Sequence, residues 1–205
     1  IVSCLINCLM RSWVRFIRNI YKDESYLTHT LPVAKKDIYL SKVLSALITS
    51  FTTILVAVVC LFICYYSKEN LELLKTSLEL TANTLDTTII KLILVISLVF
   101  FLEIVLALLI GYVGIIIGHK SNKNRMAKTI IISVISYLLT QGIILILIYL
   151  FGYIDIDVLE VFKSSVISVT AIKKVMILGI VIYLVFNIIY YFIGKKQLEQ
   201  GVNVF

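Results

Sequence analysis

The sequence predicts an all-α protein, a polytopic bundle of transmembrane helices. Of its 205 residues 60% are apolar and only 15% are charged, whereas a soluble domain carries about a quarter charged residues. Four nearly uncharged runs are long enough to cross a bilayer, and the charges gather in short segments between them. We therefore expect lipid to be the solvent for this chain, and its high hydropathy excludes disorder.

The first apolar stretch, 1–10, is too short to span a bilayer and lacks the basic start of a signal peptide. We expect the chain to enter partway through a membrane helix that runs from outside to inside. One further crossing before it would return the N-terminus to the cytoplasm. The sequence thus predicts five helices, the first partial, of a six-helix bundle, and 1–205 is one transmembrane domain.

Four complete spans follow, each too long and too uniformly apolar for an ordinary buried helix or strand. The first has 24 residues without a charge and reaches about 36 Å, enough for a hydrocarbon core of about 30 Å with some tilt. The predicted spans are 43–66, 92–117, 129–151 and 175–193.

The charges assign the sides of the membrane. Segments 11–42 and 119–128 and the C-terminal tail hold thirteen of the nineteen basic residues, while segments 67–91 and 152–174 hold six of them and seven of the twelve acids. The positive-inside rule places the first set in the cytoplasm, with the C-terminus, and predicts outer loops at 67–87 and 152–174.

Both outer loops carry apolar residues at roughly helical spacing, which predicts amphipathic segments at the outer interface. In the second loop the residues at this spacing are Val158, Leu159, Phe162, Val166, Ile167 and Val169.

The longest inner segment contains the only proline of the chain, Pro32. Because the residue before a proline avoids helical dihedral angles, a helix of about two turns should end near Leu31. A second helix should begin after Val33 and continue through Lys42 into the membrane. A helix, a proline break and a helix at the inner face form a small element that a soluble partner is able to push.

This segment, YKDESYLTHTLPVAKKDIYLSK, resembles the cytoplasmic signature of ABC-2 type permeases, especially those of low-GC Gram-positive bacteria. The tail GVNVF is also similar to the tail of that group. The matching residues are Glu24, Leu27, Leu31, Pro32, Val33, Lys35, Asp37, Ile38, Leu40, Ser41 and Lys42.

The resemblance implies a bacterial cell-membrane permease that exports a peptide, antibiotic or other amphipathic compound by alternating access. It implies a cytoplasmic coupling loop, 11–42, that contacts a separate ABC ATPase subunit, which binds ATP and Mg and hydrolyses ATP. It also implies a second permease subunit, as a homodimer or heterodimer. The residues implied in coupling are Glu24, Leu27, Leu31, Pro32, Val33, Lys35 and Lys42.

Four residues of one span are candidates for the translocation path or for helix packing. Glu103 lies near the middle of the span, where a charge is costly to insert. It either faces the path or a helix partner, or it is a protonated or hydrogen-bonded structural glutamate. Gly111, Gly114 and Gly118 follow, the last two at the GxxxG spacing that allows close helix packing.

The remaining patterns indicate no chemistry in this chain. Cys4 and Cys8, and Cys60 and Cys64, lie in apolar runs without zinc spacing, so we expect small apolar side chains and no metal. No nucleotide-binding or nucleic-acid-binding pattern is present. The alternative is a non-transport membrane protein, such as an intramembrane protease or an immunity or sensor protein. Against the protease, Glu103 has no paired catalytic group in the spans.

Overall fold

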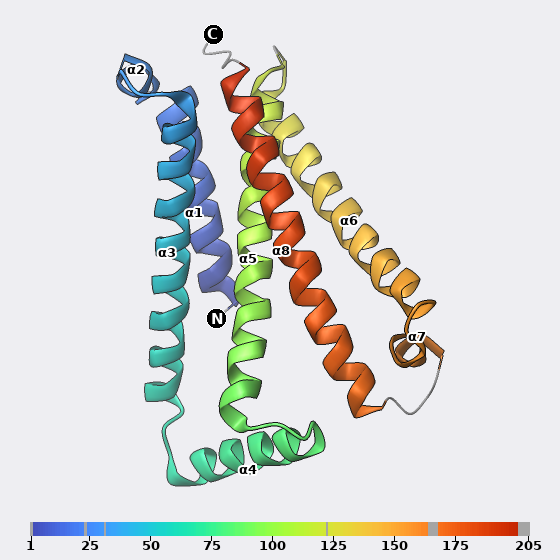
Figure 1. The fold of residues 1–205 in the computed structure, drawn as a ribbon. Helices are drawn as coiled ribbons and strands as arrows, with labels where there is room; N and C mark the ends of the chain where they lie inside the picture. The colour runs from blue at the N-terminus through green and yellow to red at the C-terminus, as the bar shows by residue number, and fades with distance from the viewer. Residues whose placement is uncertain (1, 23, 31, 122, 164–167, 201–205) are drawn as a thin grey trace. The chain divides into compact units, whose positions relative to one another are not determined.

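The computed structural model describes residues 2–22, 24–30, 32–121, 123–163 and 168–200, and within these ranges all regular structure is α-helical (Figure 1). The all-α class is confirmed. The helices of the described chain are α1 (Val2–Tyr21), α2 (Ser25–Thr30), α3 (Lys35–Cys64), α4 (Lys68–Thr84), α5 (Ile89–His119), α6 (Arg125–Gly152), α7 (Ile156–Lys163) and α8 (Val169–Glu199).

Four of these helices, α3, α5, α6 and α8, are long and apolar enough to cross a membrane. They cover the four predicted spans except for Tyr65 and Tyr66, which follow the end of α3. The chain therefore has the helix composition of a multi-pass membrane protein. Each helix continues beyond its apolar run, because a helix satisfies its own backbone hydrogen bonds in water as well as in lipid. Residues 169–174, predicted as the last part of the outer loop 152–174, form the first turns of α8.

The N-terminal region differs from the expected division into a short partial helix and a long inner segment. Residues 11–21 continue α1 as one helix of 20 residues. The helix is amphipathic, since one side buries a row of residues at helical spacing and the other carries the arginines. The buried residues are Cys8, Ser12, Phe16, Ile17, Ile20 and Tyr21. Counting the charges of 11–42 did not show that the buried residues of α1 alternate in the sequence with its arginines.

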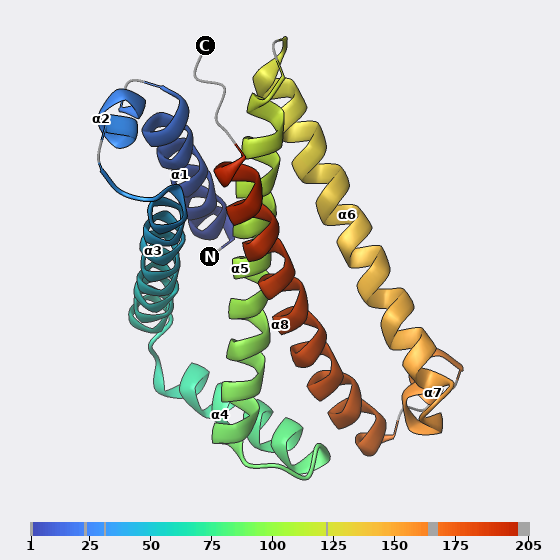
Figure 2. The same cartoon turned by 45° about the horizontal axis from the view of Figure 1, so that its top comes forward.

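The chain divides into two compact units, and each of the long helices contributes to both. The first unit comprises Ile1–Val58, Ile104–Leu139 and Phe186–Phe205. Aromatic and aliphatic side chains of α1, α3 and α5 form its core, in which Phe16 stacks on Tyr112 with ring centroids 4.2 Å apart. Figure 2 shows α2 at the end of α1, next to the start of α3.

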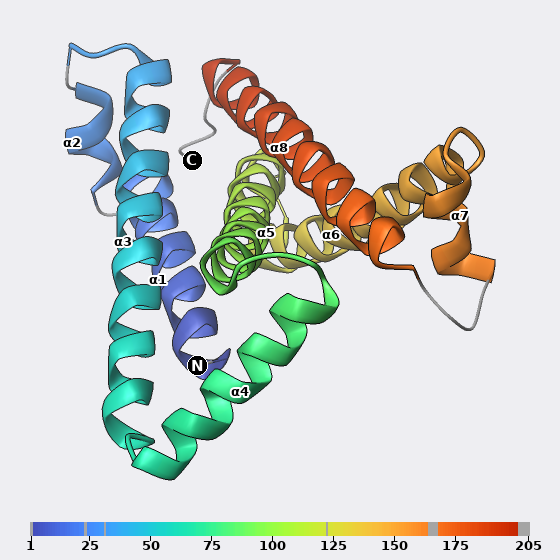
Figure 3. The ribbon, with the colours of Figure 1, turned by 60° about the horizontal axis from the view of Figure 1, so that its bottom comes forward.

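The second unit comprises Val59–Glu103 and Thr140–Val185. It contains α4 and α7, which are the helices expected in the two outer loops. Figure 3 shows α4 lying across the direction of α5. The Ser67 hydroxyl caps α4 by accepting a hydrogen bond from the Asn70 amide, 3.1 Å away. Val166 and Ile167, expected in the second amphipathic segment, lie outside the described residues.

Candidate functional sites

The proline-containing segment forms the helix, break and helix that the sequence predicts. After α1 the chain turns through a hydrogen bond from the Ser25 amide to the Lys22 carbonyl oxygen, 2.7 Å, and α2 begins. Pro32 lies in the bend that follows, and the Ala34 carbonyl oxygen accepts from the Asp37 amide, 2.9 Å, as α3 starts. α2 is thus an isolated helical turn and a half between two longer helices.

Large apolar side chains of this segment are exposed. Tyr26 is 75% exposed, Leu27 67% and Val33 48%. Pro32 and Lys35 are exposed as well, while Leu31 lies outside the described residues. Exposed apolar side chains also occur along the long helices, so what distinguishes these three is their place on the short segment between α1 and α3.

Glu24 and Lys42, both implied in coupling, instead contact α1. A Glu24 carboxylate oxygen lies 3.9 Å from the Arg18 guanidinium. With the Asn19 amide oriented to satisfy its neighbours, its nitrogen donates to Glu24 and its oxygen accepts from the Lys42 ammonium. These contacts connect the ends of α1 and α3 to the segment between them. These contacts do not include the other residues implied in coupling, which are Leu27, Pro32, Val33 and Lys35.

The three glycines of α5 each face a neighbouring helix at very short range. A Cβ at Gly118 would lie 2.7 Å from the Cα of Thr129 on α6, and one at Gly114 would lie 3.0 Å from the Ser133 Cβ. A Cβ at Gly111 would overlap the Trp13 ring of α1. Only a residue without a side chain allows these approaches, so the glycines set how closely α1 and α6 lie against α5.

The C-terminal end of α5 is held by His119, which is buried. Its ring stacks on Tyr21 of α1, with centroids 4.3 Å apart, and its Nδ1 lies 2.9 Å from the Ile115 carbonyl oxygen. Lys120 extends the contact to α8 by donating to the Gln197 side-chain oxygen, 2.5 Å away.

Two contacts of the first unit were missed at the level of sequence. Trp13 Nε1 donates to the Leu108 carbonyl oxygen at 3.3 Å, joining α1 to α5. Tyr39 of α3 is fully buried against Phe16, Tyr112 and Tyr191. Gly194 of α8 gives Tyr39 its space, since a Cβ there would lie 2.7 Å from the tyrosine Cζ. Trp13, Tyr39 and Gly194 follow no regular spacing in the sequence, so the sequence did not indicate that they contact other helices.

Glu103 has a hydrogen-bonding partner on another helix. Gln141 Nε2 of α6 donates to both carboxylate oxygens of Glu103, at 3.0 and 3.3 Å. The Tyr183 hydroxyl of α8 donates to the Gln141 side-chain oxygen at 3.3 Å. A polar chain therefore joins three apolar helices of the second unit. The hydrogen bond from Gln141 to Glu103 is consistent both with a helix contact and with a hydrogen-bonded structural glutamate.

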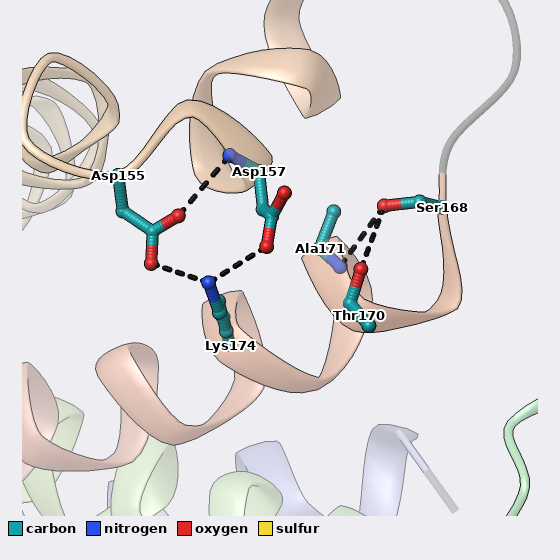
Figure 4. Close-up of polar contacts among 6 residues, drawn as sticks. All are labelled: Asp155, Asp157, Ser168, Thr170, Ala171 and Lys174. Atoms are coloured by element: carbon teal, nitrogen blue, oxygen red, sulfur yellow. Dashed lines mark hydrogen bonds and ion pairs between the residues drawn. The ribbon is translucent and has the colours of Figure 1, made fainter.

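A second polar group that the sequence did not reveal lies where α7 meets the start of α8 (Figure 4). The Lys174 ammonium donates to Asp155 at 2.6 Å and to Asp157 at 2.7 Å. Ser168 caps α8 by accepting from the Ala171 amide at 3.2 Å. The hydrogen bond from Lys174 holds the pKa of Asp155 below its ordinary value, because it favours the ionised carboxylate.

No metal centre is found in the part of the chain that the structure describes, where no group of three His, Cys, Asp or Glu side chains lies close enough to hold an ion. Cys8 is buried against α3, with its sulfur 3.9 Å from the Ser50 hydroxyl and 3.4 Å from that of Thr53. It serves there as a small packing residue.

With this geometry established, comparison with known proteins adds no relative. No family model, no curated protein and no solved structure matches the chain significantly. The fold and the contacts above therefore carry the functional argument by themselves.

Proposed function

We propose that this chain is the membrane-spanning permease subunit of an ABC-2 type ATP-driven transporter. It pairs with a second permease subunit in the bacterial cell membrane and receives mechanical work from a separate ABC ATPase. It exports an amphipathic compound, such as a peptide or antibiotic, by alternating access.

The observation that carries the proposal is the exposed apolar surface of α2 and the following bend, at the basic end of the first unit. Tyr26, Leu27 and Val33 are exposed on a segment flanked by the basic residues of α1 and α3. Basic segments beside a span face the cytoplasm, which is where an ATPase resides. Burial of such side chains in a cleft of the ATPase would account for their exposure in the isolated chain.

The contacts around α2 provide a route for the work. The Arg18–Glu24 ion pair connects the segment to α1, and α3 follows directly after the bend. Phe16 and Tyr39 then pack on each other, with ring centroids 6.4 Å apart. A displacement of α2 therefore moves α1 and α3 together. ATP drives the transport cycle only if the ATPase contacts α2 differently in its two states.

The test is co-purification with an ATPase that carries nucleotide-binding motifs and whose gene neighbours the gene of this chain. We expect Leu27→Asp and Val33→Asp to reduce the recovered ATPase at least tenfold, because each places a charge in an apolar contact. Leu73→Asp is the matched control, since Leu73 is 61% exposed on α4, for which the charge distribution predicts an outer loop.

Each variant is first required to elute as a single species in detergent. If Leu27→Asp and Val33→Asp retain the ATPase as fully as Leu73→Asp, the coupling assignment is wrong. A wild-type chain that recovers no ATPase favours the alternative of a membrane protein without transport activity.

A further inference from the structure

The polar side of α1 carries three arginines in one row. Arg11, Arg15 and Arg18 recur at intervals of four and three residues, which places them on one face of the helix. All three are exposed, and with Asn7 and Val14 they line a groove of about 460 Å³. The opposite face of α1 packs on α3 and α5. Arg15 also borders a second pocket, together with Lys42 and Ser45 of α3 and Tyr112 of α5.

The contacts of α1 with α5 fix the level of each arginine. Phe16 stacks on Tyr112 and Tyr21 on His119, and Trp13 bonds to the Leu108 carbonyl. In these three pairs the α5 residue comes 95 to 98 positions after the α1 residue. We use this offset to find which residue of α5 lies at the same height along the helix axis as a residue of α1. Arg11 is level with Leu108, about 16 Å from the end of α5 at a rise of 1.5 Å per residue.

The contacts with α3 give the same direction. Cys8 reaches Ser50, which is about 12 Å along α3 beyond Lys42, the last basic residue before the apolar run. Arg11 is one turn nearer to the inner end than Cys8. Arg11 therefore lies about 7 Å deeper than Lys42, beside the apolar parts of two helices that are long enough to cross a membrane.

Ionisable side chains at such a depth rarely face lipid and almost always face the interior of a bundle or a water-filled cavity. Arg18 is balanced by Glu24 at 3.9 Å. Within the described residues Arg11 and Arg15 make no ion pair. The groove thus has an excess of positive charge, and the apolar side chains of Met10 and Val14 line it to one side of the arginines.

We propose that the arginine face of α1 lines a water-filled vestibule that opens at the basic end of the unit and binds an anionic amphiphile. Arg11 and Arg15 take its carboxylate or phosphate group, and Met10 and Val14 contact its apolar part. The ligand is the cargo, drawn from the cytoplasmic solution, and this assignment rests on the proposed transport function. Low-dielectric walls around like charges concentrate counter-ions, which favours entry of an anion.

The experiment measures the access and the charge of the vestibule without the ATPase. In a full-length chain with its four cysteines replaced by alanine, Val14→Cys is compared with Ile48→Cys. Val14 is 48% exposed in the groove, and Ile48 is 65% exposed on α3, away from the arginines. Proteoliposomes of phosphatidylcholine are labelled with methanethiosulfonates that carry either a sulfonate or a trimethylammonium group.

We expect Val14→Cys to react and Ile48→Cys to remain unlabelled. The anionic reagent should modify Val14→Cys at least tenfold faster than the cationic one, and Arg11→Gln with Arg15→Gln should reduce this ratio at least fivefold. Dodecyl phosphate should slow the labelling and dodecyl maltoside should not. If Val14→Cys is as unreactive as Ile48→Cys, or reacts without charge preference, the vestibule is refuted.

A further arm separates cargo from lipid. Labelling in phosphatidylglycerol vesicles should equal that in phosphatidylcholine, and protection by the anionic lipid alone would overturn the assignment to cargo. The labelling does not involve the ATPase. A negative labelling result would therefore refute the vestibule and not the coupling to the ATPase. Loss of co-purification would refute the coupling and not the vestibule.

Discussion

Trp13 donates a hydrogen bond from its indole nitrogen to the main-chain carbonyl of Leu108, 3.3 Å away. The contact sets the register of α1 on α5, and Gly111 makes room for the indole ring. An amphipathic helix with three arginines is thereby held beside the apolar part of a membrane helix. The placement of α1 at this depth is the basis of the vestibule and is directly measurable.

Fluorescence quenching reports the depth of Trp13, since it is the only tryptophan in the chain. We expect lipids brominated in the middle of the acyl chain to quench it more strongly than lipids brominated near the headgroup, because Leu108 lies about 16 Å from the end of α5. The control is Trp13→Phe combined with Tyr26→Trp, where the exposed position on α2 should respond to an aqueous quencher instead. Equal quenching of both proteins by the aqueous quencher would place α1 outside the bilayer.

The glycines of α5 predict a position-dependent effect on stability. Gly118→Ala should lower the free energy of unfolding by about 1–3 kcal/mol, because its Cβ meets the backbone of Thr129 and a helix must shift. Gly142→Ala on α6 is the matched control. No atom lies within 4 Å of a Cβ there, and alanine favours the helix. Unfolding in detergent measures both, and equal effects would contradict the close approach of α5 and α6.

The polar chain among α5, α6 and α8 predicts a modest energetic coupling. Gln141→Leu should destabilise the chain by about 0.6 kcal/mol and by no more than about 1.7 kcal/mol, the range of hydrogen bonds between membrane helices. A double-mutant cycle with Glu103→Gln measures the part that belongs to the pair. A coupling energy of zero would mean that Gln141 and Glu103 do not bond in the membrane.

The same substitution tests the role of Glu103 in transport. If Glu103→Gln alters stability but leaves transport and subunit assembly unchanged, Glu103 serves helix contact alone. A loss of transport at unchanged stability would instead place it on the translocation path.

The ion cluster at α7 predicts a pH dependence at the start of α8. The folded pKa of Asp155 is depressed by Lys174, so its contribution to stability is present above the unfolded value of about 3.9 and is lost as the pH falls through the folded pKa. Hydrogen-exchange protection of residues 169–174 should decrease over this range and should decrease earlier at high salt, since the pair is exposed. Asp155→Asn should remove the dependence, and an unchanged profile in that variant would assign it to another group.

The course of the chain was largely predictable, because the properties that determine it are local. Runs of more than twenty residues with at most one charge predicted the spans that α3, α5 and α6 cover almost entirely, and Pro32 predicted the break between α2 and α3. The predicted fourth span, 175–193, leaves out Lys173 and Lys174, which lie within α8 because that helix begins at Val169. In the structure these lysines instead pair with acids of the preceding segments.

The candidate sites were less predictable, because they depend on which faces of distant helices meet. Glu103 stood out as a charge within a span, but its bond to Gln141 requires the register of α5 and α6. Trp13, Tyr39 and Gly194 gave no signal, since an aromatic residue or a glycine in an apolar run suits any lipid-facing position. The arginines of α1 contributed to the basic count of the segment 11–42. Their position on one face follows only from the helix that continues to Tyr21.

The side of the membrane on which α2 lies tests the account most directly. A cysteine-free chain with Tyr26→Cys, at a position that is 75% exposed, is expressed in cells and labelled with an impermeant maleimide from either side. We predict labelling only after the cytoplasm is opened, whereas Leu73→Cys on α4 should be labelled in intact cells. Labelling of Tyr26→Cys in intact cells would place α2 outside, out of reach of any ATPase, and would contradict the proposed function.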